Sequence, residues 1–303
     1  MLKTRLWMGA TLIVLFAVGL WLDEQWGPAP PNWLPPFPCW LIISVLAVIG
    51  CCREMRQLLR RRGIRLSRAI SYGSVIGVAL ANWIPWLVGS NGPTDHLAWP
   101  FAAVCVANMV VLIREAVVYR EPGESVTTAG AGMLLVFYLG VLATFAIELR
   151  WLGPGVLPIV ALIAAAKCGD TGAYFGGRAL GRIKLCPSLS PNKTVEGAVA
   201  GAIASVLGTW TVVAIGKMIT GVQALSWQAT VLFGLSVGVL AQVGDLIESL
   251  IKRDCQQKDA SDLMPGFGGV LDVLDSPLFS APLAFLLWIW LGPGWGAGLR
   301  SAN

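Results

Sequence analysis

Charged residues are scarce in this chain of 303 residues, at 13% of the sequence, and histidine occurs only once. A soluble globular domain carries about 25% charged residues, so this composition argues against an ordinary cytosolic enzyme and against a disordered regulator. The single histidine, His96, falls in an outer loop between two apolar runs, which excludes a Ser-His or Cys-His catalytic pair facing the cytoplasm. The seven cysteines show no metal-ligand spacing and are interpreted as reduced thiols.

Hydrophobic residues are abundant instead, at 56% of the chain. Windows of about 20 residues without a charge recur along the sequence, and an α-helix needs this length to cross a bilayer. The sequence therefore predicts an all-α polytopic membrane protein with about nine transmembrane helices. The expected spans are residues 6–22, 38–52, 69–88, 97–113, 126–147, 151–166, 198–216, 227–244 and 277–292.

The basic residues are divided unevenly between the two faces that these spans define. Nineteen of the 22 lysines and arginines fall on one side, and cytoplasmic loops are enriched in both residue types. The sequence therefore predicts a cytoplasmic N-terminus and a C-terminus on the outside. The net charge of +5 follows from this asymmetry and does not indicate binding to nucleic acid. The arginines of residues 53–68 enforce this topology, which is the favoured interpretation, or also gather anionic lipid.

Two stretches on the predicted cytoplasmic side, residues 167–197 and 244–276, are rich in polar residues. Together they hold nine of the 17 acidic residues. Ionisable groups at the ends of membrane spans are costly unless they are paired or hydrated, so they are functional candidates. We expect residues 1–150 to form N-terminal helices (about five spans) and residues 151–303 to form a catalytic membrane region that carries both stretches.

The second stretch contains a helical pattern of polar residues. Asp245, Glu248, Ser249 and Lys252 are spaced to share one face of a helix that continues from a span. One interpretation is a simple ion pair between carboxylate and ammonium. The other is a Mg²⁺ site, because Mg²⁺ takes oxygen ligands from one or two carboxylates together with substrate phosphates.

A turn is expected at residues 265–269 (PGFGG), where the helix ends. Gly268 and Gly269 permit positive φ and the close approach of another backbone. Asp272 and Asp275 follow at a spacing that places them on one face of a short helix. A turn of this kind can bring Asp272 back toward Asp245 and assemble a site with two carboxylates.

The first stretch combines glycines with a polar helix start. Glycines at positions 169, 172, 176 and 177 are expected to break any long helix. Residues 190–194 (SPNKT) supply hydroxyls, a cation and backbone N–H groups ahead of the next span, where Glu196 complements the helix dipole. Such a helix start suits phosphate, although ordinary capping loops have a similar composition. Neither stretch matches a Walker A loop.

The two stretches together predict cation-dependent handling of phosphates at the cytoplasmic face of the membrane. Lys193, Lys252, Arg253 and Lys258 would hold phosphates while the aspartates hold the metal. A histidine base is not required when the nucleophile is itself an ionised phosphate. Transfers of this kind rest mainly on positioning and on neutralisation of charge.

Longer patterns in the same stretches resemble a known family. Residues 249–259 (SLIKRDCQQKD) and 265–276 (PGFGGVLDVLDS) resemble the signature of the phosphatidate cytidylyltransferases, or CDP-diacylglycerol synthases. Residues 170–178 and 190–197 are similar to that family's motifs on the nucleotide side, so the resemblance covers roughly residues 167–282. It implies that CTP and phosphatidic acid are converted to CDP-diacylglycerol and pyrophosphate, with Mg²⁺ and room for a second cation.

The resemblance also implies roles for individual residues and a setting in the cell. Metal ligation would fall to Asp245, Asp272 and Asp275. The catalytic groove would contain Ser249, Lys252, Arg253, Lys258 and Asp259. Substrate binding would involve Asp170, Lys193, Thr194, Glu196, Gly268 and Gly269. The expected protein is a homodimer in the bilayer of the bacterial inner membrane, with its active site facing the cytoplasm.

The chain departs from the family pattern at three positions. Phe267 stands where the family usually has His, Val273 where it has Arg, and Asn192 where Lys is common. Because all the carboxylates remain, a divergent but active enzyme is favoured over a member whose catalysis has lapsed. One rival function is a CTP-dependent polyprenol or lipid kinase, which would release CDP instead of pyrophosphate. A transporter is the rival from another class, and it predicts inverted repeats and charges at the bilayer midplane.

Overall fold

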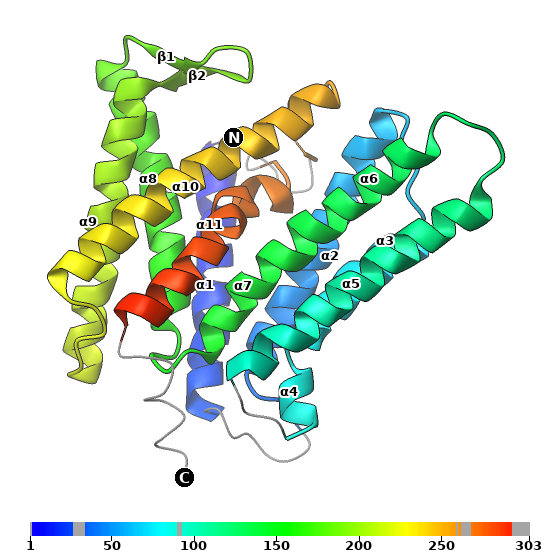
Figure 1. Cartoon of the computed structure of the whole chain (residues 1–303). Helices are drawn as coiled ribbons and strands as arrows, with labels where there is room; N and C mark the ends of the chain where they lie inside the picture. Colours follow the sequence, from blue (N-terminus) through cyan, green and yellow to red (C-terminus); the bar gives the residue numbers. More distant parts are fainter. Residues whose placement is uncertain (1, 27–33, 90–92, 259, 262–267, 293–303) are drawn as a thin grey trace. The chain divides into compact units, whose positions relative to one another are not determined.

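The computed structural model describes residues 2–26, 34–89, 93–258, 260–261 and 268–292, and these residues are mostly helical (Figure 1). The chain forms two compact units. We name the first the N-terminal unit, formed by Met1–Ile147 and Asp254–Val273, and the second the C-terminal unit, formed by Glu148–Arg253 and Leu274–Asn303. The predicted division of the chain near residue 150 stays a prediction.

The N-terminal unit is built mainly from the helices of the first half of the chain. They are α1 (Leu2–Trp26), α2 (Pro38–Arg61), α3 (Arg68–Ala81), α4 (Ile84–Leu87), α5 (Pro93–Val118), α6 (Ser125–Val136), the π-helical turn η1 (Phe137–Val141) and α7 (Leu142–Glu148). His96, which the sequence placed in a loop, lies in the first turns of α5 and is buried. The loop prediction was wrong because α5 begins before the apolar run that defined the expected span.

Small residues let the helices of the N-terminal unit pack closely. Val78 of α3 contacts Val111 of α5 and Val136 of α6 in a buried cluster, and Figure 1 shows these helices side by side. A Cβ atom on Gly132 of α6 would lie 2.8 Å from Val111, so a larger residue there would push α6 away from α5. At the start of α2, the buried Asp23 accepts hydrogen bonds from the backbone N–H groups of residues 39 and 40, which have no partner within the helix.

The C-terminal unit contains the remaining elements. They are the 3₁₀ turn η2 (Leu149–Trp151), α8 (Leu157–Leu180), the strands β1 (Lys184–Cys186) and β2 (Ser190–Thr194), then α9 (Val195–Thr220), α10 (Trp227–Asp254) and α11 (Val270–Leu291), whose first turn belongs to the N-terminal unit. The two strands form an antiparallel hairpin at one end of the α8–α9 pair (Figure 1). The sequence did not indicate these strands, because strands this short carry little alternation of polar and apolar residues.

Helix α8 runs without interruption through the glycines that were expected to break it, so that prediction was wrong. The physical reason is that these glycines face α9. Cβ atoms on Gly172 and Gly176 would collide with Ala204 and Ala200 of α9. Small residues at such positions let two helices approach closely, as is common in membranes. The glycines therefore let α8 pack directly against α9, and the hairpin connects the two helices at one end.

Six helices are long and apolar enough to cross a membrane among the residues that the structure describes. They cover Pro38–Arg61, Asp95–Val118, Ser125–Trp151, Val195–Thr220, Trp227–Asp254 and Val270–Leu291. The other three expected spans coincide with α1, with α8 and with α3, which is apolar but has only 14 residues. The chain is thus an all-α polytopic membrane protein, and the count of nine spans stays a prediction.

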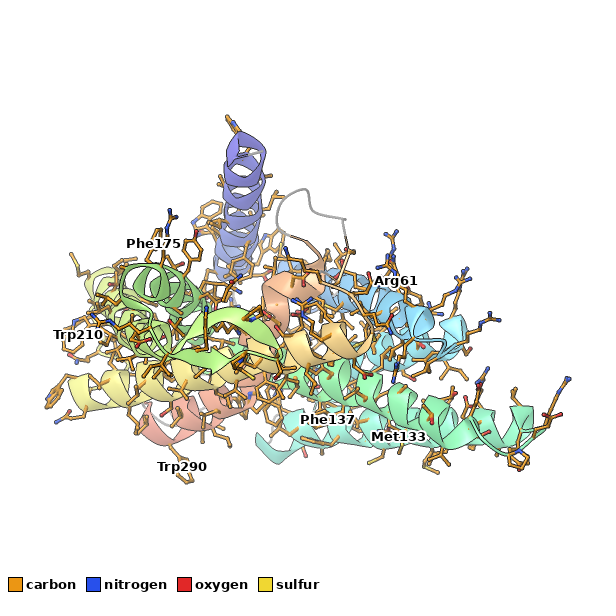
Figure 2. The ribbon with its side chains drawn as sticks, turned by 90° about the horizontal axis from the view of Figure 1, so that it is seen from above. Arg61, Met133, Phe137, Phe175, Trp210 and Trp290 are labelled. Atoms are coloured by element: carbon orange, nitrogen blue, oxygen red, sulfur yellow. The ribbon has the colours of Figure 1, made fainter. Side chains whose placement is uncertain are left out.

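Exposed apolar side chains cover both units, as a surface facing lipid requires. Figure 2 labels Met133 and Phe137 in the N-terminal unit, and Trp210 of α9 and Trp290 of α11 in the C-terminal unit. Trp290 is 83% exposed, which would be unusual for an indole ring on a water-soluble surface. All seven cysteines lie in the described part of the chain and are free thiols, as expected.

Candidate active site

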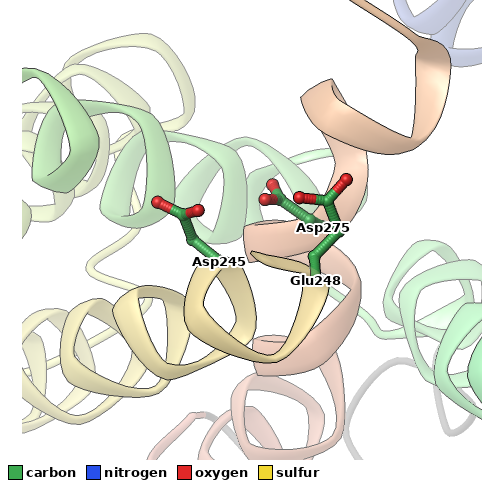
Figure 3. Close-up of side chains that lie close together, drawn as sticks. All are labelled: Asp245, Glu248 and Asp275. Atoms are coloured by element: carbon green, nitrogen blue, oxygen red, sulfur yellow. The ribbon is translucent and has the colours of Figure 1, made fainter. Parts of the chain in front are cut away.

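Three carboxylates come together inside the C-terminal unit. Asp245 and Glu248 project from α10, and Asp275 projects from α11 (Figure 3). One oxygen of each side chain lies within 4.8 Å of the oxygens of the other two. Glu248 and Asp275 are buried, whereas Asp245 is partly exposed. We name Asp245, Glu248 and Asp275 the acidic cluster.

The close approach of α10 and α11 forms the acidic cluster. Gly244 makes this approach possible, because a Cβ atom there would lie 2.5 Å from Phe279 and 3.1 Å from the carbonyl oxygen of Asp275. Further along the two helices, the rings of Phe233 and Trp288 pack edge to face with centroids 5.8 Å apart. The carboxylate of Asp275 also accepts hydrogen bonds from the backbone N–H and the hydroxyl of Ser276, which fix its orientation.

Lysines accompany the carboxylates of this region. Lys193 of β2 lies 2.7 Å from Asp245, and Lys252 forms an ion pair with Glu248 one turn along α10. On α8, Lys167 pairs with Asp170 at 2.9 Å, and both groups are close enough to act electrostatically on Asp275. The site therefore combines carboxylates, which can bind a cation, with ammonium groups, which can bind phosphates, and these groups come from α8, the hairpin, α10 and α11.

The hairpin is held at its base by two residues that the sequence analysis assigned to substrate. Glu196 accepts hydrogen bonds from the backbone N–H groups of Arg182 and Ile183. Thr194 caps α9 by accepting a hydrogen bond from Gly197. Arg253 of α10 donates to the carbonyl oxygen of Leu189 in the hairpin turn.

Two further residues predicted for the site, Ser249 and Lys258, lie in the described part of the chain. Ser249 is buried on α10, one residue beyond Glu248. Lys258 is exposed in the segment that follows α10. Asp259 and Phe267 lie outside the described residues. Their predicted roles, like those of Glu196 and Thr194, stay predictions.

Asp272 occupies a different environment from the acidic cluster. Within the N-terminal unit, its carboxylate accepts hydrogen bonds from the backbone N–H groups of Gly269, at 2.6 Å, and Ala260, at 3.1 Å. Gly268 has a φ of +85°, as expected for the turn. Asp272 therefore closes the turn that precedes α11, and its predicted role as a metal ligand stays a prediction.

The acidic cluster has the donors that a hard cation needs. Mg²⁺ binds oxygen at about 2.1 Å, so ligands on opposite sides of the ion are about 4.2 Å apart. A spread of at most 4.8 Å among the three oxygens fits this geometry after a small contraction. Glu248 was placed on the correct helix face by its spacing from Asp245, but the sequence analysis did not assign it to the metal. Lys167 was also missed, although its position three residues before Asp170 was a usable signal.

Comparison with known proteins agrees with the motifs. The model of the cytidylyltransferase family matches residues 3–290. The chain belongs to the cytidylyltransferase family. This finding confirms the resemblance that the sequence analysis drew from residues 167–282 and extends it across both units.

Several curated relatives of this cytidylyltransferase family member carry a specific name. A phosphatidate cytidylyltransferase of Brucella suis is 42% identical over 94% of this chain and 92% of its own length. Proteins with the same name from Bacillus subtilis and Synechocystis are 34% and 30% identical, and the matches cover 76% and 83% of this chain. They cover 82% and 88% of the two relatives.

Proposed function

We propose that this chain is a phosphatidate cytidylyltransferase that makes CDP-diacylglycerol and pyrophosphate from CTP and phosphatidic acid. The observation that carries the proposal is the acidic cluster, with its lysines, in a member of the cytidylyltransferase family. The names of the relatives favour this reaction over the lipid kinase that the sequence analysis kept as its alternative.

In the proposed reaction, an ionised oxygen of the phosphatidate phosphate attacks the α-phosphorus of CTP. A new P–O bond forms, the bond to the β-phosphate oxygen breaks, and pyrophosphate leaves with that electron pair. Lys193 and Lys252 are positioned to bind phosphate oxygens beside the acidic cluster. The residues therefore contribute mainly by orienting two anionic substrates and by offsetting their mutual repulsion.

We further propose that Asp245, Glu248 and Asp275 hold Mg²⁺, which would neutralise charge on the triphosphate when bound. The ion pairs Lys193–Asp245 and Lys252–Glu248 support this assignment, because each lysine compensates a carboxylate that would otherwise be costly beside its neighbours. When CTP and a cation arrive, the carboxylates are available to the cation and the lysines to the phosphates.

The arrangement in the membrane is part of the same proposal. We infer nine spans with a cytoplasmic N-terminus, an active site open to the cytoplasm of a bacterial inner membrane, and a homodimer. The uneven distribution of basic residues supports the orientation. Labelling of single cysteines introduced into successive loops would test it, and light scattering of the purified protein would test the dimer.

The reaction is tested with purified protein, phosphatidic acid, Mg²⁺ and CTP labelled on the α-phosphate. Label in a lipid product together with release of pyrophosphate is the expected result. If the label stays in CDP when a polyprenol is supplied, the protein is a CTP-dependent kinase. If neither lipid reacts, the proposed activity is wrong for this chain.

A further inference from the structure

Glu54 of α2 is a buried carboxylate that the functional motifs do not include. Only 1% of its surface is exposed, and it belongs to the N-terminal unit. Its oxygens accept hydrogen bonds from the backbone N–H groups of Val270, at 3.0 Å, and Leu271, at 2.7 Å. A third hydrogen bond comes from the hydroxyl of Ser261, at 2.6 Å. Glu54 thus binds the first two residues of α11.

This contact provides hydrogen-bond acceptors for the first N–H groups of α11, where the residue before the helix has no side chain to accept them. The first N–H groups of a helix have no partner within the helix, and a polar side chain at the preceding residue usually accepts from them. That preceding residue is Gly269, which has no side chain. Glu54 takes its place from another helix, while Asp272 accepts from the N–H of Gly269 in the manner of a capping box.

Two glycines leave the space that this contact needs. A Cβ atom on Gly269 would collide with the carboxylate of Glu54. One turn before Glu54 on α2, a Cβ atom on Gly50 would lie 3.0 Å from Val270. Gly50 and Gly269 therefore allow the start of α11 to lie directly against α2. The neighbour that approaches Gly269 closely is thus the side chain of Glu54, and the predicted role of Gly269 in substrate binding stays a prediction.

We propose that Glu54 is a positioning residue that sets the start and rotation of α11, and through them the direction of Asp275. The helix is continuous from Val270 to Leu291, and Asp275 follows Leu271 by one turn. If α11 slid by one residue against the carboxylate of Glu54, Asp275 would rotate by about 100° about the helix axis. Burial of a carboxylate also carries a desolvation penalty, and apolar packing in its place would stabilise the fold as well or better. Stability alone therefore does not account for Glu54.

The experiment compares the unmodified protein with Glu54→Gln, Glu54→Ala and Asp275→Asn. Asp23→Asn is the matched control, because Asp23 is also a buried carboxylate that binds the start of a helix, but that helix is α2. Two quantities are measured: the Mg²⁺ concentration that gives half-maximal turnover, and binding of Mn²⁺ followed by electron paramagnetic resonance without turnover. Thermal unfolding in detergent reports on stability.

We expect Glu54→Gln to weaken both cation measures by about 10- to 100-fold, the range seen when a residue that orients a metal ligand is replaced. Glu54→Ala should weaken them further, while Asp23→Asn should lower only the unfolding temperature. Wild-type cation affinity in folded Glu54→Gln would overturn the proposal. If both Glu54 variants fail to fold, Ser261→Ala, which removes one of the three hydrogen bonds, should give a smaller weakening, and an unchanged affinity there would overturn it.

The positioning role of Glu54 rests on the proposed cation site. The Mn²⁺ measurements distinguish a wrong cation site from a wrong positioning role. If Asp275→Asn binds Mn²⁺ as the unmodified protein does, the cation site is wrong. If Asp275→Asn loses Mn²⁺ and Glu54→Gln does not, only the positioning role is wrong. If the unmodified protein binds Mn²⁺ but makes no CDP-diacylglycerol, the Mn²⁺ measurements still decide the role of Glu54.

Discussion

The ammonium nitrogen of Lys193 lies 2.7 Å from a carboxylate oxygen of Asp245, so the residue proposed to bind phosphate contacts a residue proposed to bind the cation. This pair connects the hairpin with α10 inside the C-terminal unit. The hairpin thus brings a lysine of β2 next to a carboxylate that lies some fifty positions later in the sequence.

Replacing Lys193 with alanine is expected to raise the KM for CTP more than it lowers kcat, because a bound phosphate loses a charge-assisted hydrogen bond. A bond of this kind contributes about 1.5–3 kcal/mol, which corresponds to roughly 10- to 100-fold in kcat/KM. Lys184→Ala in the partner strand β1 is the control, since Lys184 is exposed in the same hairpin. Equal effects of the two variants would show that hairpin charge alone matters.

Gly244 offers a test of the helix packing that forms the acidic cluster. Gly244→Ala should force α10 away from Phe279 and separate Asp245 from Asp275. Overpacking of this kind costs about 1–3 kcal/mol of stability, and we expect a larger loss of activity. Gly73→Ala on α3 is the matched control, because a Cβ atom there meets nothing within 4 Å. Thermal unfolding and turnover are measured together, and full activity in Gly244→Ala would contradict the packing argument.

Cys255, just beyond α10, gives a prediction about pH. Burial raises the pKa of its thiol, Asp254 raises it further, and Arg62 partly offsets both. Because the thiolate is the reactive form, alkylation by a maleimide should be slower at pH 7 than that of an exposed thiol and should need a higher pH to reach the same rate. Arg62→Ala removes the offsetting cation and should slow the reaction further. Peptide mapping by mass spectrometry follows the reaction, and faster labelling in Arg62→Ala would be the contrary result.

Phe267 stands where the family usually has histidine, in a segment outside the described residues. Phe267→His is expected to retain or raise turnover, because it restores the residue usual in the family in a chain that keeps all of the expected carboxylates. Phe267→Ala is the comparison that separates the gain of an imidazole from the loss of a ring. A large loss of activity in Phe267→His would show that the turn has adapted to phenylalanine.

Much of the fold could be predicted from hydropathy, since apolar windows marked most of the helices that the structure contains. The face shared by Asp245, Glu248, Ser249 and Lys252 could also be predicted, because α10 continues past the apolar run to Asp254. Helical spacing alone determines that face.

Other features depend on contacts between distant residues. Glycines read as helix breaks in α8 proved to be packing positions, because their role depends on α9 as a neighbour. The partnership of Glu54 with Val270 and Leu271 joins residues more than 200 positions apart, and a single acid within an arginine-rich segment gave no signal of it. The sequence also carried no signal that Asp254–Val273 would group with the first helices rather than with the rest of the C-terminal half.

The acidic cluster is proposed to be the cation site of a phosphatidate cytidylyltransferase. The most direct measurement is transfer of α-phosphate label from CTP to lipid by Asp245→Asn, Glu248→Gln and Asp275→Asn, each shown to be folded by thermal unfolding. The account predicts that every variant loses at least about 100-fold in turnover at low Mg²⁺, as expected when a catalytic metal is lost. Near-wild-type label transfer by any one of the three would contradict it.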